Sequence, residues 1–276
     1  ILSSRPEKLR KEIENILHKL KACNITNITW SGGEFFLHKH HLEVLKLTKK
    51  LGFYCSVATN GLLISDEKLQ AILPYIDKLN LSLDFLEDDL NEEHSRGHGY
   101  LKIFTSLIKK VRELKPNILI KVTTIVLKQN IKSFHEIYKT LLSQNINIWK
   151  IVNYCSIRNS TDSKTDIFKV NDSEFAKVAE TYLSKTQNFI IVVEDDKVFQ
   201  HQYIISPSGN LCLSKDDKEV VLVKNIHEES LQTLKKHLCK SEQNKLLNEV
   251  NLNTYKMFFE VAVDGNITRV AERNFI

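Results

Sequence analysis

The stretch NITWSGGEFFLHKHH, residues 27–41, decides the fold, because it contains a strand, a turn and the start of a helix in succession. The run 27–31 is apolar and β-rich, Gly32-Gly33-Glu34 follows it, and a helical pattern begins at about His40. The two glycines lack β-carbons, so a ligand can approach their backbone closely, and Glu34 supplies a carboxylate for an ammonium group. The same three residues are also compatible with a tight strand-to-helix turn.

The alternation of strand and helix continues outward from this stretch. The predicted strands are 27–31, 53–59, 78–83, 118–127 and 147–154. The predicted helices are 4–20, 40–51, a short one capped by Ser65 or Asp66, 100–114, 132–144 and 172–184. Five βα units with short connections, and strands too apolar to alternate cleanly, predict an α/β fold with a parallel sheet and outer helices. That description fits a complete or partial (β/α) barrel and a doubly wound sheet.

The alternation of strands and helices ends after about residue 188. Short β-like runs occur at 189–193, 202–206, 210–213 and 220–223, and a helix is predicted from about Glu228. A hairpin is predicted at 256–270, turning at Asp264-Gly265-Asn266. The regular alternation of strand and helix therefore ends in this part of the chain.

Composition limits the function. The chain has 276 residues, 42% of them hydrophobic, and a net charge of +5 with lysines scattered among glutamates, so nothing compels nucleic-acid binding. A small substrate with phosphate groups is compatible with this charge. The sequence shows no apolar run of membrane-span length and no signal segment, which predicts a cytoplasmic location. The five cysteines are widely separated and predict buried reduced thiols.

Polar residues gather where the predicted strands end. In a parallel βα sheet the carboxyl ends of the strands meet at one rim, where function concentrates. The residues at or near these ends are Ser31 to Glu34, Thr59 to Gly61, Ser82, Asp84, Thr123, Thr124, Lys150 and Asn153. Arg96-Gly97-His98-Gly99 precedes a helix and could bind a phosphate or carboxylate. No phosphate-loop pattern is present, which argues against an ordinary kinase or ATPase.

Five segments in this order resemble the core of the radical S-adenosylmethionine (SAM) enzymes. They are NITWSGGEFFL, VATNGLLI, LNLSLDFLEDDLNEEHSRGHGY, IKVTTIVLKQNI and INIWKIVNY. The resemblance implies a partial (β/α)6 barrel over residues 1–215, with a C-terminal β/α extension over 216–276. It implies a 4Fe-4S cluster and SAM as cofactors, with reductive cleavage of SAM to a 5'-deoxyadenosyl radical that abstracts hydrogen from a substrate. An external electron donor would be a partner.

The resemblance assigns the cofactor residues one by one. Gly32, Gly33 and Glu34 would bind the methionine amino group of SAM, and Asn60 would line the same pocket. Ser82 and Arg96 would meet its carboxylate or ribose, and the backbone at Val152 and Asn153 would face the adenine. The family holds its cluster with a Cys-x3-Cys-x2-Cys segment, because iron-sulfur clusters need thiolate ligands. That segment, with the first strand of the barrel, is expected upstream of Ile1, so no metal ligand is assigned within the chain.

Within the superfamily the pattern is most similar to the viperin-like branch, which dehydrates a nucleoside triphosphate to a 3'-deoxy-3',4'-didehydro product and serves in antiviral defence. By this resemblance Lys121, Thr123, Lys150 and Lys215 would bind the triphosphate, and Tyr203 would be a catalytic residue near the radical path. Without the resemblance, Lys121 and Lys150 are equally well explained as solvent-facing strand ends.

Other hypotheses stay open. One is a radical SAM enzyme that modifies a peptide or protein. The segment that follows the barrel in this chain has a sequence pattern similar to that of the corresponding segment in such enzymes. Another is a barrel without a cluster that acts as a binding module. His38, His40 and His41 are interpreted as a solvated helix start, and the acidic residues Asp84, Glu87, Asp88 and Asp89 as a solvated turn.

Overall fold

A computed structural model describes most of the chain. The described residues are 6–154, 165–183, 185, 189–194, 203–206, 209–215 and 218–238. The hairpin predicted at 256–270 lies outside them.

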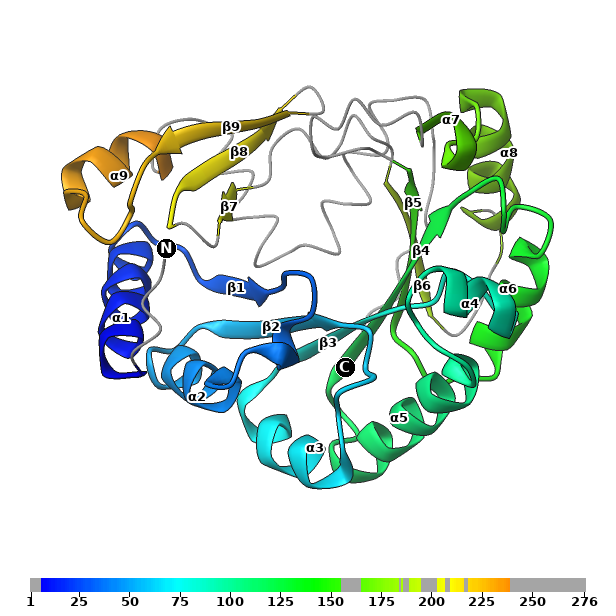
Figure 1. The fold of residues 1–276 in the computed structure, drawn as a ribbon, viewed down its shortest axis with the longest axis horizontal. Coiled ribbons are helices and arrows are strands. Elements are labelled where there is room, and N and C mark those ends of the chain that lie inside the picture. Colours follow the sequence, from blue (N-terminus) through cyan, green and yellow to red (C-terminus); the bar gives the residue numbers. More distant parts are fainter. Residues whose placement is uncertain are drawn as a thin grey trace.

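The main element is a parallel sheet whose strand order is the chain order. Each strand pairs with the one before it in the sequence, and every pairing is parallel. The strands are β1 (Asn27–Trp30), β2 (Tyr54–Thr59), β3 (Lys78–Ser82), β4 (Leu119–Val126), β5 (Ile148–Asn153) and β6 (Ile190–Glu194). The sheet curves into an open arc with helices on its outer side (Figure 1). The predicted α/β fold of partial-barrel type is confirmed.

Helices follow the strands along the chain. They are α1 (Pro6–Ala22), α2 (His41–Lys50), α3 (Asp66–Ile72), α4 (Asp88–Glu93), α5 (Tyr100–Leu114), α6 (Phe134–Leu142), α7 (Thr165–Phe168), α8 (Asp172–Leu183) and α9 (Leu231–Leu238), with 3-10 turns η1 (Phe35–Leu37) and η2 (Leu73–Tyr75). Ser65 caps α3, since its hydroxyl accepts a hydrogen bond from the backbone N–H of Lys68 at 3.2 Å. In α5 the residues spaced three and four apart, such as Tyr100, Phe104 and Leu107, are buried.

The two faces of the sheet differ in chemistry. Successive strand residues point to opposite faces. On β4 the residues Ile120, Val122, Thr124 and Val126 are fully buried, whereas the alternate residues are half-buried. The first set faces the helices and forms the apolar core with their buried sides. The second set, which includes Lys121 and Thr123, faces the concave side, called the lumen below.

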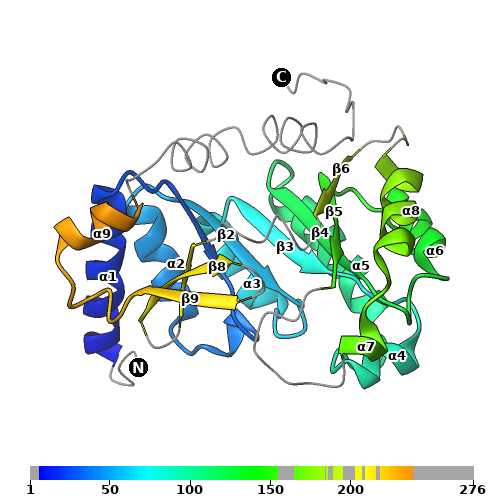
Figure 2. The same cartoon turned by 90° about the horizontal axis from the view of Figure 1, so that it is seen from above.

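A smaller sheet lies toward the β1 side of the arc. Its strands β7 (Tyr203–Ile205), β8 (Leu211–Lys215) and β9 (Lys218–Val223) pair antiparallel in that order. Seen from above, α9 lies beside α1 (Figure 2). The ammonium group of Lys19 on α1 donates to the carbonyl oxygens of Ile226, His227 and Glu229 at 3.1, 2.7 and 2.7 Å. Helix α1 thus anchors the segment between β9 and α9. The predicted division at residue 215 stays a prediction.

Two details differ from the predicted elements. The run 189–193 was predicted as one of the short β-like runs that follow the five βα units, whereas Ile190–Glu194 is the sixth parallel strand of the main sheet. The acidic run read as a solvated turn contains a helix, α4, whose Asn91 is buried and donates to the carbonyls of Phe85 and Glu87. Those two hydrogen bonds fix the helix against the end of β3, which the charge of the run alone did not indicate.

Candidate functional site

The carboxyl end of β1 leaves its glycine backbone open. Gly32 has φ of +152°, a conformation that side chains with a β-carbon rarely adopt. At both Gly32 and Gly33 a β-carbon would meet no described atom within 4 Å. A ligand can therefore approach the backbone of both glycines closely.

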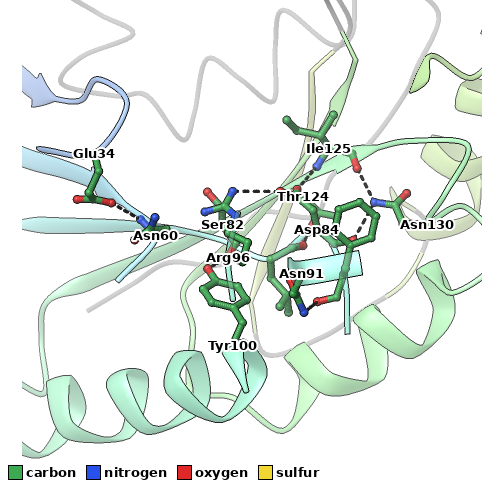
Figure 3. A network of polar contacts seen from close by, with 12 residues as sticks. Glu34, Asn60, Ser82, Asp84, Asn91, Arg96, Tyr100, Thr124, Ile125 and Asn130 are labelled. Carbon is green, nitrogen blue, oxygen red and sulfur yellow. Dashed lines mark hydrogen bonds and ion pairs between the residues drawn. The ribbon is translucent and has the colours of Figure 1, made fainter. Parts of the chain in front are cut away.

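Glu34 joins the ends of the first two strands. One carboxylate oxygen accepts hydrogen bonds from the Thr59 hydroxyl at 2.8 Å and the Phe36 N–H at 3.1 Å. The other oxygen accepts from the Asn60 N–H at 2.9 Å (Figure 3). Asn60 in turn accepts from the Leu62 N–H through its side-chain oxygen at 3.0 Å. The carboxylate therefore holds the two loops together and keeps acceptor capacity on the oxygen that faces Asn60.

Arg96 is positioned over the end of β3. Its guanidinium donates to Asp84 at 3.3 Å and lies 5.6 Å from the centre of the Tyr100 ring. The Tyr100 hydroxyl donates to the Ser82 carbonyl at 2.5 Å. Asp84 is the one hydrogen-bond acceptor of the Arg96 guanidinium within the part of the chain that the structure describes, so the other N–H groups of the guanidinium remain available for a ligand. Figure 3 shows Ser82, Arg96 and Asp84 in one group beside the Glu34–Asn60 pair.

Asp84 is part of this site, and its interpretation as a solvated acidic residue is wrong. Its carboxylate is 12% exposed and accepts from the Ile125 N–H at 2.9 Å as well as from Arg96. Burial raises the pKa of Asp84, while the hydrogen bond from Ile125 and the charge of Arg96 act in the opposite direction. Asp84 links β3 to β4 and orients the guanidinium.

The predicted cofactor residues fall into two groups. The strand ends bring Gly32, Gly33, Glu34, Asn60, Ser82 and Arg96 to the rim over β1, β2 and β3. Val152 and Asn153 lie at the carboxyl end of β5, where alternation points Val152 into the lumen and Asn153 to the helix side. The first group offers open glycine backbone, a carboxylate and a guanidinium, a donor and acceptor set that fits the amino-acid part of SAM.

The lumen contains every charged residue of the six strands. These are Lys78 on β3, Lys121 on β4, Lys150 on β5 and Glu194 on β6. The register pairs Asn80 with Lys121, Thr123 with Lys150 and Val152 with Glu194, which places all four charges on the concave face. Three lysines and one carboxylate give this buried face a positive charge.

The charges of the lumen interact with one another. Lys150, 13% exposed, forms an ion pair with the fully buried Glu194. Burial, assisted by the charges of Lys150 and Lys78, lowers the pKa of Lys121 to about 7, and Glu194 opposes this shift. Burial also lowers the pKa of Lys78, with Lys150 as the second cause. Buried cations without a matching number of carboxylates favour an anionic ligand.

Lys78, Asn80 and Glu194 were not predicted as site residues. The signal that identifies them is the period of two along a strand: once Lys121 and Lys150 face the lumen, the register places these three on the same face. The register itself was not available from the sequence.

Two predicted residues lie on the smaller sheet. The Tyr203 hydroxyl donates to the carbonyl of His237, in the last turn of α9, at 2.9 Å. Lys215 ends β8. The catalytic role of Tyr203 and the phosphate-binding role of Lys215 stay predictions.

The described residues do not fit a 4Fe-4S cluster. Cys23, Cys55 and Cys212 are buried, and burial raises the pKa of the Cys55 thiol to about 12. Cys155 and Cys239 lie outside the described residues. Within the described ranges no group of three histidine, cysteine or acidic side chains could hold a metal ion, His38, His40 and His41 included. No helix in the same ranges is long and apolar enough to span a membrane.

Comparisons with known proteins agree with this geometry. The family model described as the radical SAM superfamily matches residues 3–141. The chain is 26% identical over 203 residues to an S-adenosylmethionine-dependent nucleotide dehydratase of Lacinutrix mariniflava, covering 72% of this chain and 41% of that protein. It is 23% identical over 234 residues to a protein of the same name from Flammeovirga pacifica, covering 79% and 78%. The chain thus spans less than half the length of the first of these relatives.

Solved structures are similar in fold. Streptococcus suis SuiB bound to S-adenosylmethionine aligns with a TM-score of 0.61 and 16% identity, covering 84% of this chain and 59% of that one. Native anSMEcpe with bound AdoMet and a peptide aligns with a TM-score of 0.60 and 14% identity, covering 90% and 75%. At these identities the likeness concerns the arrangement of the sheet and its helices.

Proposed function

The chain belongs to the radical SAM superfamily, and from that premise we propose that it binds SAM at the rim over β1 to β3 and acts on a nucleoside triphosphate in the lumen. The reaction class is dehydration of the ribose to a 3'-deoxy-3',4'-didehydro nucleotide. The cofactors of this family are a 4Fe-4S cluster and SAM. The cluster and SAM together, with an electron from an external donor, would supply the hydrogen abstraction from the substrate.

The rim residues have distinct roles in this proposal. The open backbone at Gly32 and Gly33 lets the ammonium group of the methionine part come close enough to donate hydrogen bonds to backbone carbonyl oxygens. Glu34 fixes the Thr59–Asn60 loop and adds an acceptor oxygen. Arg96, oriented by Asp84, donates to the carboxylate or ribose together with the Ser82 hydroxyl. The backbone at Val152 and Asn153 faces the adenine.

The observation that carries the substrate class is the buried positive charge of the lumen. Lys121 and Lys150 lie on adjacent strands with Thr123 beside Lys150 in the register, and Glu194 alone among the strand residues opposes them. A triphosphate supplies the missing negative charge, and desolvated ammonium groups bind phosphate oxygens strongly. The relatives from Lacinutrix mariniflava and Flammeovirga pacifica are named as nucleotide dehydratases, which supports the same class.

The experiment that tests the proposal measures turnover by the full-length protein. Protein prepared without oxygen is incubated with SAM, a chemical reductant and each of the four common nucleoside triphosphates, and 5'-deoxyadenosine and nucleotide products are measured by mass spectrometry. We expect 5'-deoxyadenosine that depends on one nucleotide, together with a product lighter by one water. Lys150→Met should lower this activity at least 10-fold, while Lys109→Met, on the exposed side of α5, should leave it unchanged.

Each alternative gives a different result. Formation of 5'-deoxyadenosine that depends on a peptide and not on any nucleotide would support the peptide-modifying enzyme. A full-length protein that takes up no iron or sulfide, and that binds SAM or nucleotide without cleaving SAM, would support the binding module. An external electron donor and a cytoplasmic location belong to the proposal as well.

A further inference from the structure

The three lumen lysines lie at three different depths. Lys150 is level with Thr123 and Ser82, because the register pairs Ser82 with Thr123 and Thr123 with Lys150. Lys121 is level with Asn80, two residues further from the carboxyl rim. Lys78 is level with Leu119, two residues deeper again. At roughly 3.3 Å per strand residue each step is roughly 7 Å, and the long lysine side chains can bridge such steps.

Lys78, the deepest of the three lysines, has no anionic partner among the described residues. The structure gives Lys78 one contact, with the Tyr54 ring 5.9 Å from its ammonium group, and no ion pair among the described residues. Burial, with the like charge of Lys150 as the second cause, lowers the pKa of Lys78. A buried ammonium group without a carboxylate is costly unless a ligand neutralises it.

A second, independent feature lies beside it. Asn80 is on the same face one step above Lys78, is 7% exposed, and its side-chain oxygen has no hydrogen-bond partner within the described ranges. Buried amides are normally hydrogen-bonded, so an unpartnered one facing a positively charged lumen indicates an absent ligand. Because oxygen and nitrogen of an amide are interchangeable by a flip, its N–H donors can serve a phosphate oxygen.

We propose that Lys78 and Asn80 form a separate anion subsite at the bottom of the lumen, which binds the terminal phosphate of the substrate and selects triphosphates over diphosphates. This inference rests on the proposed function, because it assumes a nucleotide whose phosphates point down the lumen. In this arrangement Lys150 and Lys121 hold the phosphates nearer the ribose, and Lys78 is reached only by a chain of three phosphates.

The test measures binding without turnover, using the full-length protein without reductant. Calorimetry with inorganic tripolyphosphate and with pyrophosphate gives two dissociation constants for each variant. We expect wild-type protein to bind tripolyphosphate at least 10-fold more tightly than pyrophosphate. Lys78→Met should remove this difference by weakening tripolyphosphate binding alone, and Lys78→Arg should restore most of it. Asn80→Ala should weaken tripolyphosphate binding about 3-fold to 10-fold.

Control variants distinguish a failure of the subsite from a failure of the proposed function. Lys150→Met should weaken both ligands, and the exposed Lys109→Met should weaken neither. If wild-type protein binds neither polyphosphate, the proposed function and the subsite both fail. If wild-type protein binds both, but Lys78→Met weakens them equally or not at all, the subsite fails and the proposed function stands. Thermal unfolding and SAM affinity, both expected to be retained in Lys78→Met, exclude misfolding as the cause.

Discussion

Glu34 shows how one side chain can serve both structure and ligand binding. Its carboxylate accepts three hydrogen bonds, which tie the end of β1 to the Thr59–Asn60 turn after β2. Both carboxylate oxygens accept hydrogen bonds. In a glutamine one of the two positions is an NH2 group, so at least one of the N–H or O–H groups around Glu34 would face another donor and lose its acceptor. The loops would then lose the geometry that leaves Gly32 and Gly33 open.

Glu34→Gln should therefore weaken SAM binding at least 10-fold and lower the free energy of unfolding by about 1–2 kcal/mol, because a donor faces a donor. Equilibrium dialysis with labelled SAM and denaturant unfolding measure the two effects. Glu113→Gln, at an exposed position of α5, is the matched control and should change neither. Unchanged SAM affinity in Glu34→Gln would contradict the role assigned to this carboxylate.

Lys121 gives the folded protein a distinctive pH dependence. Its pKa is about 7 in the folded state, against about 10.4 for an unfolded lysine. Below pH 7 both states hold the proton, and the folded state bears the full cost of the buried charge. Between pH 7 and about 10 the folded state releases the proton while the unfolded state keeps it, so stability rises with pH. Lys78, Lys150 and Glu194 are the charged strand residues that face this ammonium group from the neighbouring strands.

Lys121→Met should consequently stabilise the protein most at pH 6. The gain in free energy of unfolding over wild type should shrink by about 1.4 kcal/mol per pH unit between pH 7 and 9. Urea unfolding of both proteins across this range measures the gain, with Lys109→Met as a control that shows no such slope. A gain that is the same at all pH values would mean that Lys121 stays protonated.

At the level of single residues, the sequence predicted part of the candidate site. Lys121 and Lys150 were singled out by resemblance, and the structure places them on one buried face. Lys78 was missed, and Asp84 was placed at the rim but interpreted as solvated, for the same physical reason: both depend on which face of a strand or loop a side chain takes. Neighbouring strands set that choice, through register for Lys78 and through the Ile125 N–H for Asp84.

The elements themselves were predicted well where burial is periodic. The helix Tyr100–Leu114 and the strand Leu119–Val126 have strong patterns of 3.6 and 2 residues, and both were predicted to within a residue. The short helix Asp88–Glu93 was missed because its six residues are nearly all polar, and a single buried side chain, Asn91, fixes it. The strand Ile190–Glu194 was recognised, but its sheet was not, because partner choice depends on contacts distant in sequence.

The smaller sheet is attached to the rest of the molecule by apolar packing and by the hydrogen bonds of Lys19. Lys19 on α1 donates to three carbonyl oxygens between β9 and α9, which lie more than 200 residues away along the chain. The apolar contact between α1 and α9 lies beside this point. The position of β7, β8 and β9 relative to the main sheet thus depends on this ammonium group together with apolar packing, since Leu211 and Val223 belong to the same buried cluster as the main core.

Lys19→Met should loosen this attachment and leave the main sheet intact. Loss of the charged hydrogen bonds should cost about 2 kcal/mol of local stability, equal to roughly a 30-fold faster exchange of amide hydrogens in 226–238. Hydrogen exchange read by mass spectrometry should show no change in β4 and β5. Lys11→Met, at an exposed site on the same helix, is the control. Faster exchange across the whole chain would instead show that α1 and the main sheet unfold together.

The strand order of the main sheet also bears on how the chain assembles. Because each strand pairs with the strand that precedes it in the sequence, every new βα unit finds its neighbour already synthesised. Loop closure between successive strands is short, and short closures are entropically cheap and fast. The sheet can therefore grow from the amino-terminal side while the ribosome is still working. The Lys19 attachment joins residues 207 to 210 positions apart, so we expect it to form after the strands of the lumen have paired.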